Sequence, residues 1–322
     1  MQRLCLALSV WLAALGLAGE ASAQGYPNRT VRIVVPFAPG GGVDVLARLV
    51  GTKLSELVQQ PVIVDHRPGA GGNLGADVVA KAPPDGYTIL LTVSGLAVSP
   101  SLYRTLPFDP LKDLIPVTEV VASRLVLLVT PKLPVNSVQE LVAHAKSKPG
   151  GLNYGSSGLG APLHLTMEIF KSSAGVDIQH VPYRGDAPVN AALIAGDIDL
   201  AFVPQLTGLP LIQGGQVRGL AVTGSARMPA LPSLPTVAEA GVRGLEVSSW
   251  NGMFVPAGTP REIVAAIQQQ VARVLATEVG ERIRGTGNDP VGSTPAEFEA
   301  KFKADVARFA KVIEDAKIPK LD

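Results

Sequence analysis

Short runs of β-branched residues alternate with segments of helical periodicity along most of this chain, and this alternation limits the possible fold more than any other feature. Strands are predicted at residues 31–36, 62–65 and 87–92. Between the first two strands, apolar residues recur at helical spacing, namely Leu46, Val50, Leu54, Leu57 and Val58. Such alternation is typical of βαβ units with a mainly parallel sheet. We therefore predict an α/β fold.

A second set of alternating elements begins with the long apolar strand predicted at residues 125–130. Further strands are predicted at 152–154, 178–182, 198–203 and 217–223, and helices at 137–148, from 162 onward and at 188–195. Ser137-x-x-Glu140 is a capping box that opens the first of these helices. The chain ends in a strand at 247–255 and two helices, which capping boxes at Thr259 and Thr294 announce.

The order of these elements predicts two interleaved lobes. Lobe 1 comprises residues 24–124 and 247–322, and lobe 2 comprises residues 125–246, so that the chain crosses between them near Leu125 and again near Glu246. A chain of 322 residues is long enough for two domains. The double crossover favours a hinged clamshell, with its ligand in the cleft beyond the carboxyl ends of the strands.

The first residues have the pattern of an export signal. Arg3 precedes an apolar run at residues 4–18, and Ala-Ser-Ala at 21–23 matches a small-x-small cleavage site. We predict a signal peptide at residues 1–23. An uncleaved anchor is the alternative, although the run is short for a bilayer span. The single cysteine, Cys5, lies within this segment, so no disulfide is expected in the mature chain.

The charge balance argues against one class of partner. The chain has 28 Lys and Arg against 27 Asp and Glu, and charged residues make up 17% of it. The chain has no excess of basic residues that could bind a phosphate backbone, so nucleic acid is not expected as a partner. An anionic ligand is then recognised chiefly by backbone amides, hydroxyl groups and helix N-termini.

The first glycine-rich loop is a candidate for such recognition, because it joins a predicted strand to a predicted helix. Its sequence is Pro36-Phe37-Ala38-Pro39-Gly40-Gly41-Gly42-Val43-Asp44. Convergent N–H groups and the helix dipole favour an anion at this position. A dinucleotide fingerprint fails because Val45 stands where glycine is needed, and the Gly-Lys-Ser/Thr of a P-loop is absent. A tight turn with Asp44 at the helix terminus is the alternative.

The loop at residues 155–162 is a second candidate. Ser156, Ser157 and Gly158 offer hydroxyl and amide groups that suit a carboxylate, and simple helix capping by the serines is the alternative. A Gly-x-Ser-x-Gly nucleophile elbow fails because residue 159 is Leu159. His164, in the first turns of the following helix, is placed to approach the cleft, although a packed helix histidine is the commoner arrangement.

The loop at residues 181–188 is the third candidate. Asp186 is predicted as the N-cap of the following helix, two residues before Pro188. Tyr183 is placed to close over a ligand, with a surface tyrosine as the alternative. The glycine cluster at residues 67–75 is predicted to be a structural turn, with shaping of the cleft wall as the alternative.

The sequence has no pattern that indicates catalysis. The four histidines are scattered, without His-x-x-x-His spacing, so no metal site is predicted. No cofactor motif, paired carboxylates or nucleophile-base set stands out. The loops are therefore expected to bind a ligand without reacting with it.

These loops and several other segments resemble the tripartite tricarboxylate transporter substrate-binding proteins, also called the Bug family. The matching segments occur in order over nearly the whole mature chain, at residues 36–44, 69–73, 84–88, 155–158 with His164, 181–185, 234–241 and 256–260. The resemblance implies a periplasmic-binding-protein fold of type II, the Venus flytrap. It also implies a periplasmic receptor that captures a mono-, di- or tricarboxylate and delivers it to an integral-membrane permease. We expect a monomer without a cofactor.

The resemblance also implies which residues bind the ligand. Family members hold one ligand carboxylate deep in the cleft through backbone amides, hydroxyls and bridging waters. The corresponding residues here are Phe37, Ala38, Pro39, Gly40, Gly41, Gly42, Asp44 and Ser94 from lobe 1, and Ser156, Ser157 and Gly158 from lobe 2. Tyr183 and Gly185 border the more variable end of the ligand.

Two residues depart from the family pattern. Asp186 stands where glycine or alanine is common, and Val203 stands where many members have aspartate. Loss of that aspartate argues against an amino-acid ligand, although Asp186 is placed to replace it in part. The identity of the acid stays open. Two other functions remain as alternatives: an extracytoplasmic sensor that signals to a membrane kinase, and an exported α/β enzyme.

Overall fold

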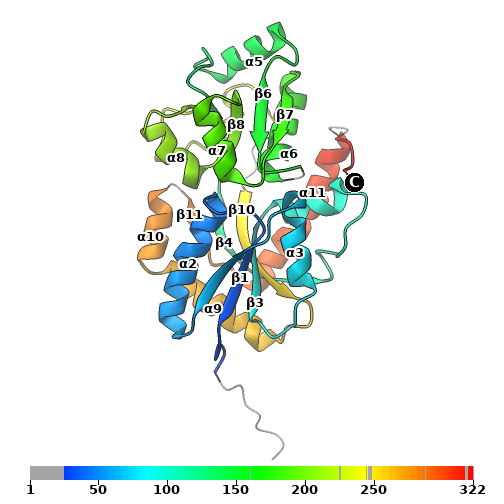
Figure 1. The fold of residues 1–322 in the computed structure, drawn as a ribbon, viewed down its shortest axis with the longest axis vertical. Coiled ribbons are helices and arrows are strands. Elements are labelled where there is room, and N and C mark those ends of the chain that lie inside the picture. Colours follow the sequence, from blue (N-terminus) through cyan, green and yellow to red (C-terminus); the bar gives the residue numbers. More distant parts are fainter. Residues whose placement is uncertain are drawn as a thin grey trace, which may run out of the picture.

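In the computed structural model of the protein, the described residues are 25–159, 161–224, 226–243, 245, 249–286, 288–315 and 318–321. They form two lobes stacked along the longest axis of the molecule (Figure 1). Each lobe has a central sheet with helices on its faces, so the predicted two-lobe α/β fold is confirmed. The predicted signal peptide at residues 1–23 and the predicted return crossover at 246/247 lie outside the described residues.

The sheet of lobe 1 has the strand order β11-β4-β10-β3-β1-β2. Its strands are β1 (Val31–Val35), β2 (Val62–His66), β3 (Thr88–Val93), β4 (Leu114–Ser123), β10 (Ser249–Pro256) and β11 (Asp289–Pro290). Strand β1 pairs in parallel with β2 and β3, whereas β10 pairs antiparallel with both β3 and β4.

The sheet of lobe 2 has the strand order β7-β6-β8-β5-β9. Its strands are β5 (Leu125–Val129), β6 (Asn153–Ser156), β7 (Gln179–Pro182), β8 (Leu200–Pro204) and β9 (Arg218–Val222). Strand β6 is parallel to β7 and β8, whereas β5 is antiparallel to β8 and β9.

Both sheets are therefore mixed. Most strands of each sheet run in one direction, as expected, and a minority run antiparallel to them. The reason is the crossover. Strand β4 ends at Ser123 and β5 begins at Leu125, so one nearly continuous strand carries the chain out of lobe 1, and the predicted boundary at 124/125 falls at this joint. Strand β10 runs back through lobe 1 beside β4. A strand that leaves a lobe and the strand that returns to it run in opposite directions, and such neighbours pair antiparallel.

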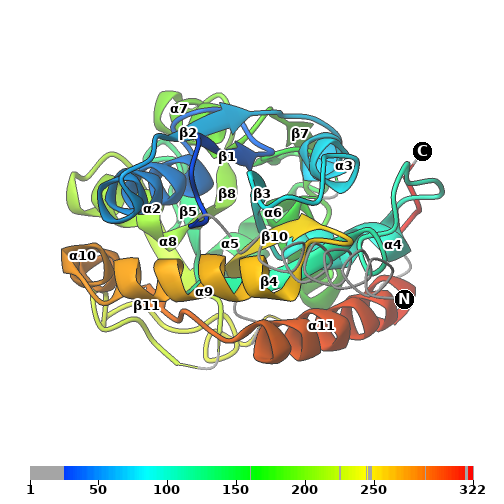
Figure 2. The same cartoon turned by 90° about the horizontal axis from the view of Figure 1, so that it is seen from below.

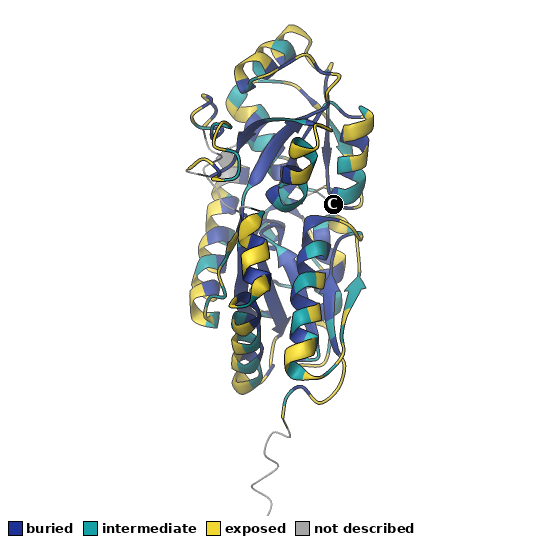
Figure 3. Ribbon diagram, turned by 90° about the vertical axis from the view of Figure 1, so that its left-hand side faces the viewer, coloured by how far each residue is buried: buried dark blue, intermediate teal, exposed yellow. Residues whose placement is uncertain are grey.

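Helices cover both faces of each sheet. The described helices are α2 (Gly42–Val58), the short 3-10 helix η1 (Ala70–Gly72), α3 (Asn73–Ala80), α4 (Gly95–Leu102), α5 (Val138–Ser147), α6 (Pro162–Ala174), α7 (Asp186–Ala195), α8 (Gln205–Gln213), α9 (Arg261–Leu275), α10 (Glu278–Gly285) and α11 (Pro295–Asp315). Figure 2 shows α2 and α9 along the same side of lobe 1, and α11 lies against α4. Figure 3 shows that the buried residues concentrate on the strands and on the helix faces turned toward them.

The alternation of side chains along β1 explains the layered core. Ile33 and Val35 pack with Leu46 and other residues of one apolar cluster, whereas Val34 packs with Phe298 in the cluster on the other face. Successive side chains of a strand point to opposite faces, so an all-apolar strand requires helices on both of them. The rigid lobes that result position the loops between them.

Two of the three predicted capping boxes are confirmed. The hydroxyl of Ser137 accepts a hydrogen bond from the N–H of Glu140 at 3.1 Å, and that of Thr294 accepts from the N–H of Glu297 at 3.3 Å. The prediction for Thr259 was wrong, because its hydroxyl donates to the Pro256 carbonyl and the helix begins after Pro260.

An aromatic cluster fixes the strand that returns from lobe 2. Trp250 on β10 contacts the rings of Phe254, Phe298 and Phe302, with ring centroids 5.1–6.0 Å apart. Its indole N–H donates to the buried carboxylate of Asp305 at 2.7 Å. The start of β10 is thus held against α11.

We predict that Phe298→Ala lowers the free energy of unfolding by about 3–5 kcal/mol, the usual cost of a cavity left by a buried aromatic ring. Phe298 is fully buried. Urea denaturation followed by circular dichroism measures the change. Leu57→Ala is the matched control, because Leu57 is 46% exposed and its truncation leaves no cavity. Equal losses from the two variants would contradict the assignment of Phe298 to the core.

Candidate functional site

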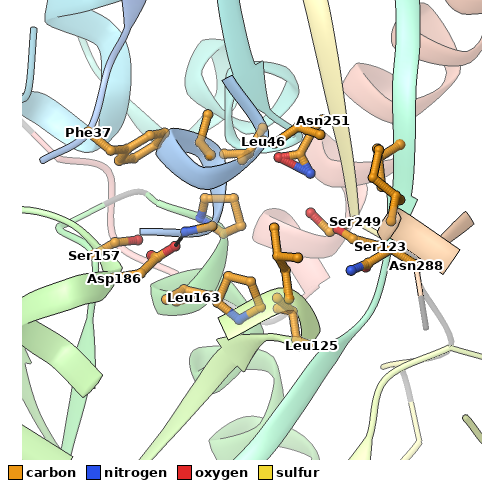
Figure 4. Close-up of a pocket in the computed structure, with 18 residues that line it drawn as sticks. Phe37, Leu46, Ser123, Leu125, Ser157, Leu163, Asp186, Ser249, Asn251 and Asn288 are labelled. Carbon is orange, nitrogen blue, oxygen red and sulfur yellow. Dashed lines mark hydrogen bonds between the residues drawn. The ribbon is translucent and has the colours of Figure 1, made fainter. Parts of the chain in front are cut away.

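A narrow cavity lies between the lobes and takes its lining from both. Lobe 1 and the crossover contribute Phe37, Gly42, Val43, Leu46, Val93, Val121, Ser123, Ser249, Asn251, Ile283 and Asn288. Lobe 2 contributes Leu125, Ser157, Pro162, Leu163, Asp186, Pro204 and Leu206. Figure 4 places Asp186 and Ser157 at one end of this interlobe cavity and Ser123, Ser249 and Asn288 at the other. Its volume is about 40 Å³, which is room for a few water molecules.

The N-terminus of α2 faces this cavity because the glycine-rich loop ends there. Gly40 has a φ of 86°, which suits glycine, and the helix follows at Gly42. Gly41 caps the helix and has no side chain to fill the cap, so the N–H of Gly42 is directed to the other lobe. A helix N-terminus of this kind has partial positive charge and stabilises an anion.

Asp44 shapes this loop and is not among the residues that line the cavity. Its carboxylate accepts hydrogen bonds from the Gly40 N–H at 2.8 Å and contacts Arg48 at 2.9 Å and His66 at 2.8 Å. Burial opposes ionisation, but the hydrogen bonds from Gly40, Arg48 and His66 outweigh it and lower the pKa of Asp44. This geometry matches the alternative given above for the glycine-rich loop, a tight turn with Asp44 at the helix terminus.

Asp186 lies across the cavity from α2, and the prediction that it caps its own helix was wrong. Helix α7 begins at Asp186 itself, after Gly185. The carboxylate points to the other lobe, where its Oδ2 accepts from the Gly42 N–H at 3.3 Å. Burial raises the pKa of Asp186 to about 6, although hydrogen bonds from Gly42 and the Ser157 hydroxyl oppose the increase.

A second, more open cavity of about 500 Å³ shares Phe37 and Ser157 with the interlobe cavity. Gly158 and Tyr183 line it, together with the glycine cluster at residues 69–72 that was predicted as a structural turn. At its edge the Ala38 N–H donates to the Arg184 carbonyl at 3.3 Å, a backbone contact between the lobes. Gly185 permits this approach, since a Cβ there would lie 3.0 Å from the Ala38 nitrogen. Pro39 is exposed on the same loop.

Ser156 and His164 lie behind the loop, and neither is among the residues that line the interlobe cavity. The Ser156 hydroxyl is 2.6 Å from Nε2 of His180 and accepts from the Gly158 N–H at 3.2 Å. Burial, followed by the nearby His164, lowers the pKa of His180 to about 4. Burial also lowers the pKa of His164, whose ring stacks with Tyr154. This group holds the serine loop in place from within lobe 2.

The far end of the cavity is polar and was not predicted. Ser123 ends β4, while Ser249 and Asn251 begin β10, so the two crossover strands supply these side chains. The predicted Ser94 is not among the residues that line this cavity, and its hydroxyl lies 2.9 Å from that of Ser249. Asn288 donates to Thr286, and its own Oδ1 is buried without a hydrogen-bond partner in the described structure. The available sequence signal was the polar residues at the end of β4 and at the start of β10.

Within the described residues, no group of three or more His, Cys, Asp or Glu side chains is placed to hold a metal ion. The described helices also include none long and apolar enough to cross a membrane.

Residues 46–318 match the model of a family described as the tripartite tricarboxylate transporter family receptor. Three solved structures are similar over nearly the whole chain. The R. palustris protein Rpa4515 with adipate has 41% sequence identity and a TM-score of 0.89, and the match covers 92% of this chain and all of that one. The periplasmic binding protein BugD has 33% identity and a TM-score of 0.89 at the same coverage.

MatC (Rpa3494) from Rhodopseudomonas palustris with bound malate has 31% identity and a TM-score of 0.86, over 89% of this chain and all of that one. These matches confirm both the predicted resemblance and the predicted periplasmic-binding-protein fold.

We predict that Asp44→Asn lowers the free energy of unfolding by about 1.5–3 kcal/mol at pH 7, because it removes charged hydrogen bonds that hold the glycine loop. The folded-state pKa of Asp44 is lowered, so the stabilisation is complete above the ordinary pKa of aspartate, about 3.9, and is lost as the pH falls through the folded value. Denaturation at pH 7 and pH 3 measures the difference between the variant and the parent protein.

Asp177→Asn is the control for this experiment, since Asp177 is exposed and a small effect is expected at both pH values. A loss for Asp44→Asn that is as large at pH 3 as at pH 7 would show that its ionised form is not what stabilises the loop.

Proposed function

Because the chain belongs to the tripartite tricarboxylate transporter receptor family, we propose that it captures a small carboxylate between its lobes and delivers it to an integral-membrane permease. One observation carries the proposal. The N-terminus of α2 and the Ser157 hydroxyl converge on one end of a cavity lined by both lobes. A ligand carboxylate at that end receives hydrogen bonds and the favourable field of the helix dipole without a cationic partner.

The size of the cavity supports capture by closure. A volume of about 40 Å³ is too small for an organic acid of four to six carbons, so the ligand enters when the lobes part. Parting separates the Gly42–Asp186 and Ala38–Arg184 contacts, which are the interlobe hydrogen bonds described above. The ligand then shifts the population toward a closed form in which both lobes contact it.

The related structures support the ligand class, because they contain adipate and malate, two small dicarboxylates. The predicted signal peptide at residues 1–23 supports a periplasmic location for the mature protein. We propose that it acts there as a monomer and performs no chemistry on its ligand. The Ser156–His180 pair is consistent with this role, because it lies behind the cavity lining and organises the loop.

We predict that Ser157→Ala weakens carboxylate binding about fivefold to tenfold, the effect of one lost hydrogen bond of about 1 kcal/mol. Isothermal titration with adipate and malate measures the dissociation constants, and the uncharged adipamide tests the need for the carboxylate. Ser172→Ala on α6 is the matched control, because Ser172 is exposed and outside the cavity lining. Unchanged affinity in Ser157→Ala would move the carboxylate to another part of the cleft.

We predict that Gly41→Leu abolishes measurable binding while the protein stays folded. Gly41 has φ −80° and ψ 173°, which leucine adopts without strain. A Cβ at this position would lie 3.3 Å from the Cβ of Asp186, so a larger side chain prevents the lobes from closing. Thermal denaturation with and without adipate detects the loss of ligand stabilisation.

Gly285→Leu is the control for this variant, since a Cβ at residue 285 meets nothing within 4 Å. Ligand stabilisation of Gly41→Leu equal to that of Gly285→Leu would argue against binding by lobe closure. Failure of every small carboxylate to bind the parent protein would argue against the proposed function itself.

A further inference from the structure

The protein already holds a carboxylate of its own at the proposed carboxylate site. Oδ2 of Asp186 accepts from the Gly42 N–H at 3.3 Å, and the nearby Ser157 hydroxyl favours the ionised form of this carboxylate. These are the two donors proposed above for the ligand. Asp186 is 8% exposed and comes from α7 of lobe 2, so its carboxylate reaches across the cleft to the helix N-terminus of lobe 1. A ligand carboxylate at this end must lie within a few ångströms of it.

No cationic side chain of the described residues lines the cavity to separate the two carboxylates. Among the described residues that line the interlobe cavity, Asp186 is the only ionisable one. On α2 and β2, Arg48 and His66 both contact the carboxylate of Asp44, and none of these three residues lines the cavity. Arg184, from the loop that carries Asp186, is exposed and lines the more open cavity.

The elements packed against Asp186 add no further charge at the contact. The serine loop offers the Ser157 hydroxyl and the start of α2 offers the Gly42 N–H, while the apolar ring of Pro204 lies beside Gly42. The pocket around the carboxylate is otherwise apolar, with Phe37, Leu46 and Leu163 in its lining. Such surroundings penalise each buried negative charge.

Two carboxylates held together in an apolar site cannot both stay ionised, and the pair titrates as a unit that retains one proton. Burial has already raised the pKa of Asp186 to about 6, so one of the two partners takes up a proton near neutral pH. A shared proton converts like-charge repulsion into a charge-assisted hydrogen bond between the two carboxyl groups.

We propose that this receptor captures its carboxylate together with one proton, which the ligand shares with Asp186. This inference rests on the proposed function and deepens it. Asp186 thereby makes capture dependent on pH. It also selects a ligand group that accepts a hydrogen bond, either from the shared proton or from the N–H and hydroxyl donors around Asp186. The proton comes from solvent and returns to solvent on release, so no bond other than that to hydrogen is made or broken.

The first test measures the affinity for hexanoate of the parent protein and of Asp186→Asn between pH 5.5 and 8. Above pH 6 the free protein has lost the proton that the complex retains, so the dissociation constant of the parent protein is expected to rise about tenfold per pH unit. Asparagine donates a hydrogen bond without titrating, so Asp186→Asn should bind with an affinity that does not change with pH. Asp197→Asn, at an exposed position after α7, should retain the parent profile.

The second test measures proton uptake directly. Isothermal titration of the parent protein with hexanoate at pH 7.5, in phosphate and in Tris, gives the number of protons taken up from the difference in measured heat. We expect about one proton for the parent protein and for Asp197→Asn, and none for Asp186→Asn. A role of Asp186 in lobe packing alone would change affinity without changing this number.

Several results would overturn the inference. An affinity of the parent protein for hexanoate that is constant from pH 6 to 8, with no proton uptake, would reject the shared proton while the proposed function stands. Binding of hexylamine that is lost in Asp186→Asn would instead make Asp186 a partner for a cation. If hexanoate, adipate and malate all fail to bind the parent protein and Asp186→Asn at every pH, the proposed function fails and the inference fails with it.

Discussion

The antiparallel pairing of β4 with β10 is the constraint on which the rest of the molecule depends. Strand β4 runs almost without interruption into β5 of the other lobe, and β10 returns beside it, so the two lobes are joined through the centre of a sheet. The aromatic cluster around Trp250 fixes the start of β10 against α11. Ser123 at the end of β4 and Ser249 at the start of β10 line the cavity, so the joint between the lobes also supplies the polar end of the interlobe cavity.

The recognition end of the site relies on backbone dipoles and hydroxyl groups. The Gly42 N–H belongs to a helix whose cap residue, Gly41, has no side chain, and Asp44 holds the preceding loop by bonding the Gly40 N–H. The proposed anion site thus has no lysine or arginine among its described lining residues. A cation would bind an anion more strongly, but it would also attract anions to the open cleft without requiring closure.

Asp186 changes the electrostatics of this arrangement. Its carboxylate accepts from the Gly42 N–H, a donor proposed for the ligand, and no compensating charge lies among the described residues that line the cavity. A buried carboxylate of this kind is costly unless it is protonated or well hydrogen-bonded, so its presence is informative. It links the occupancy of the site to proton concentration, which backbone amides alone do not do.

The sequence by itself determined the α/β class, the two sets of elements and the loops of the site, because side-chain periodicity and glycine placement follow from local backbone geometry. Pairing between distant segments decided the mixed order of the sheets, strand β4 with its internal Pro116 and Glu119, and the polar residues of the crossover. For Asp186 the local pattern predicted a helix cap. Only the tertiary structure brings its carboxylate to Gly42, 144 residues away, because that contact exists only when two lobes meet.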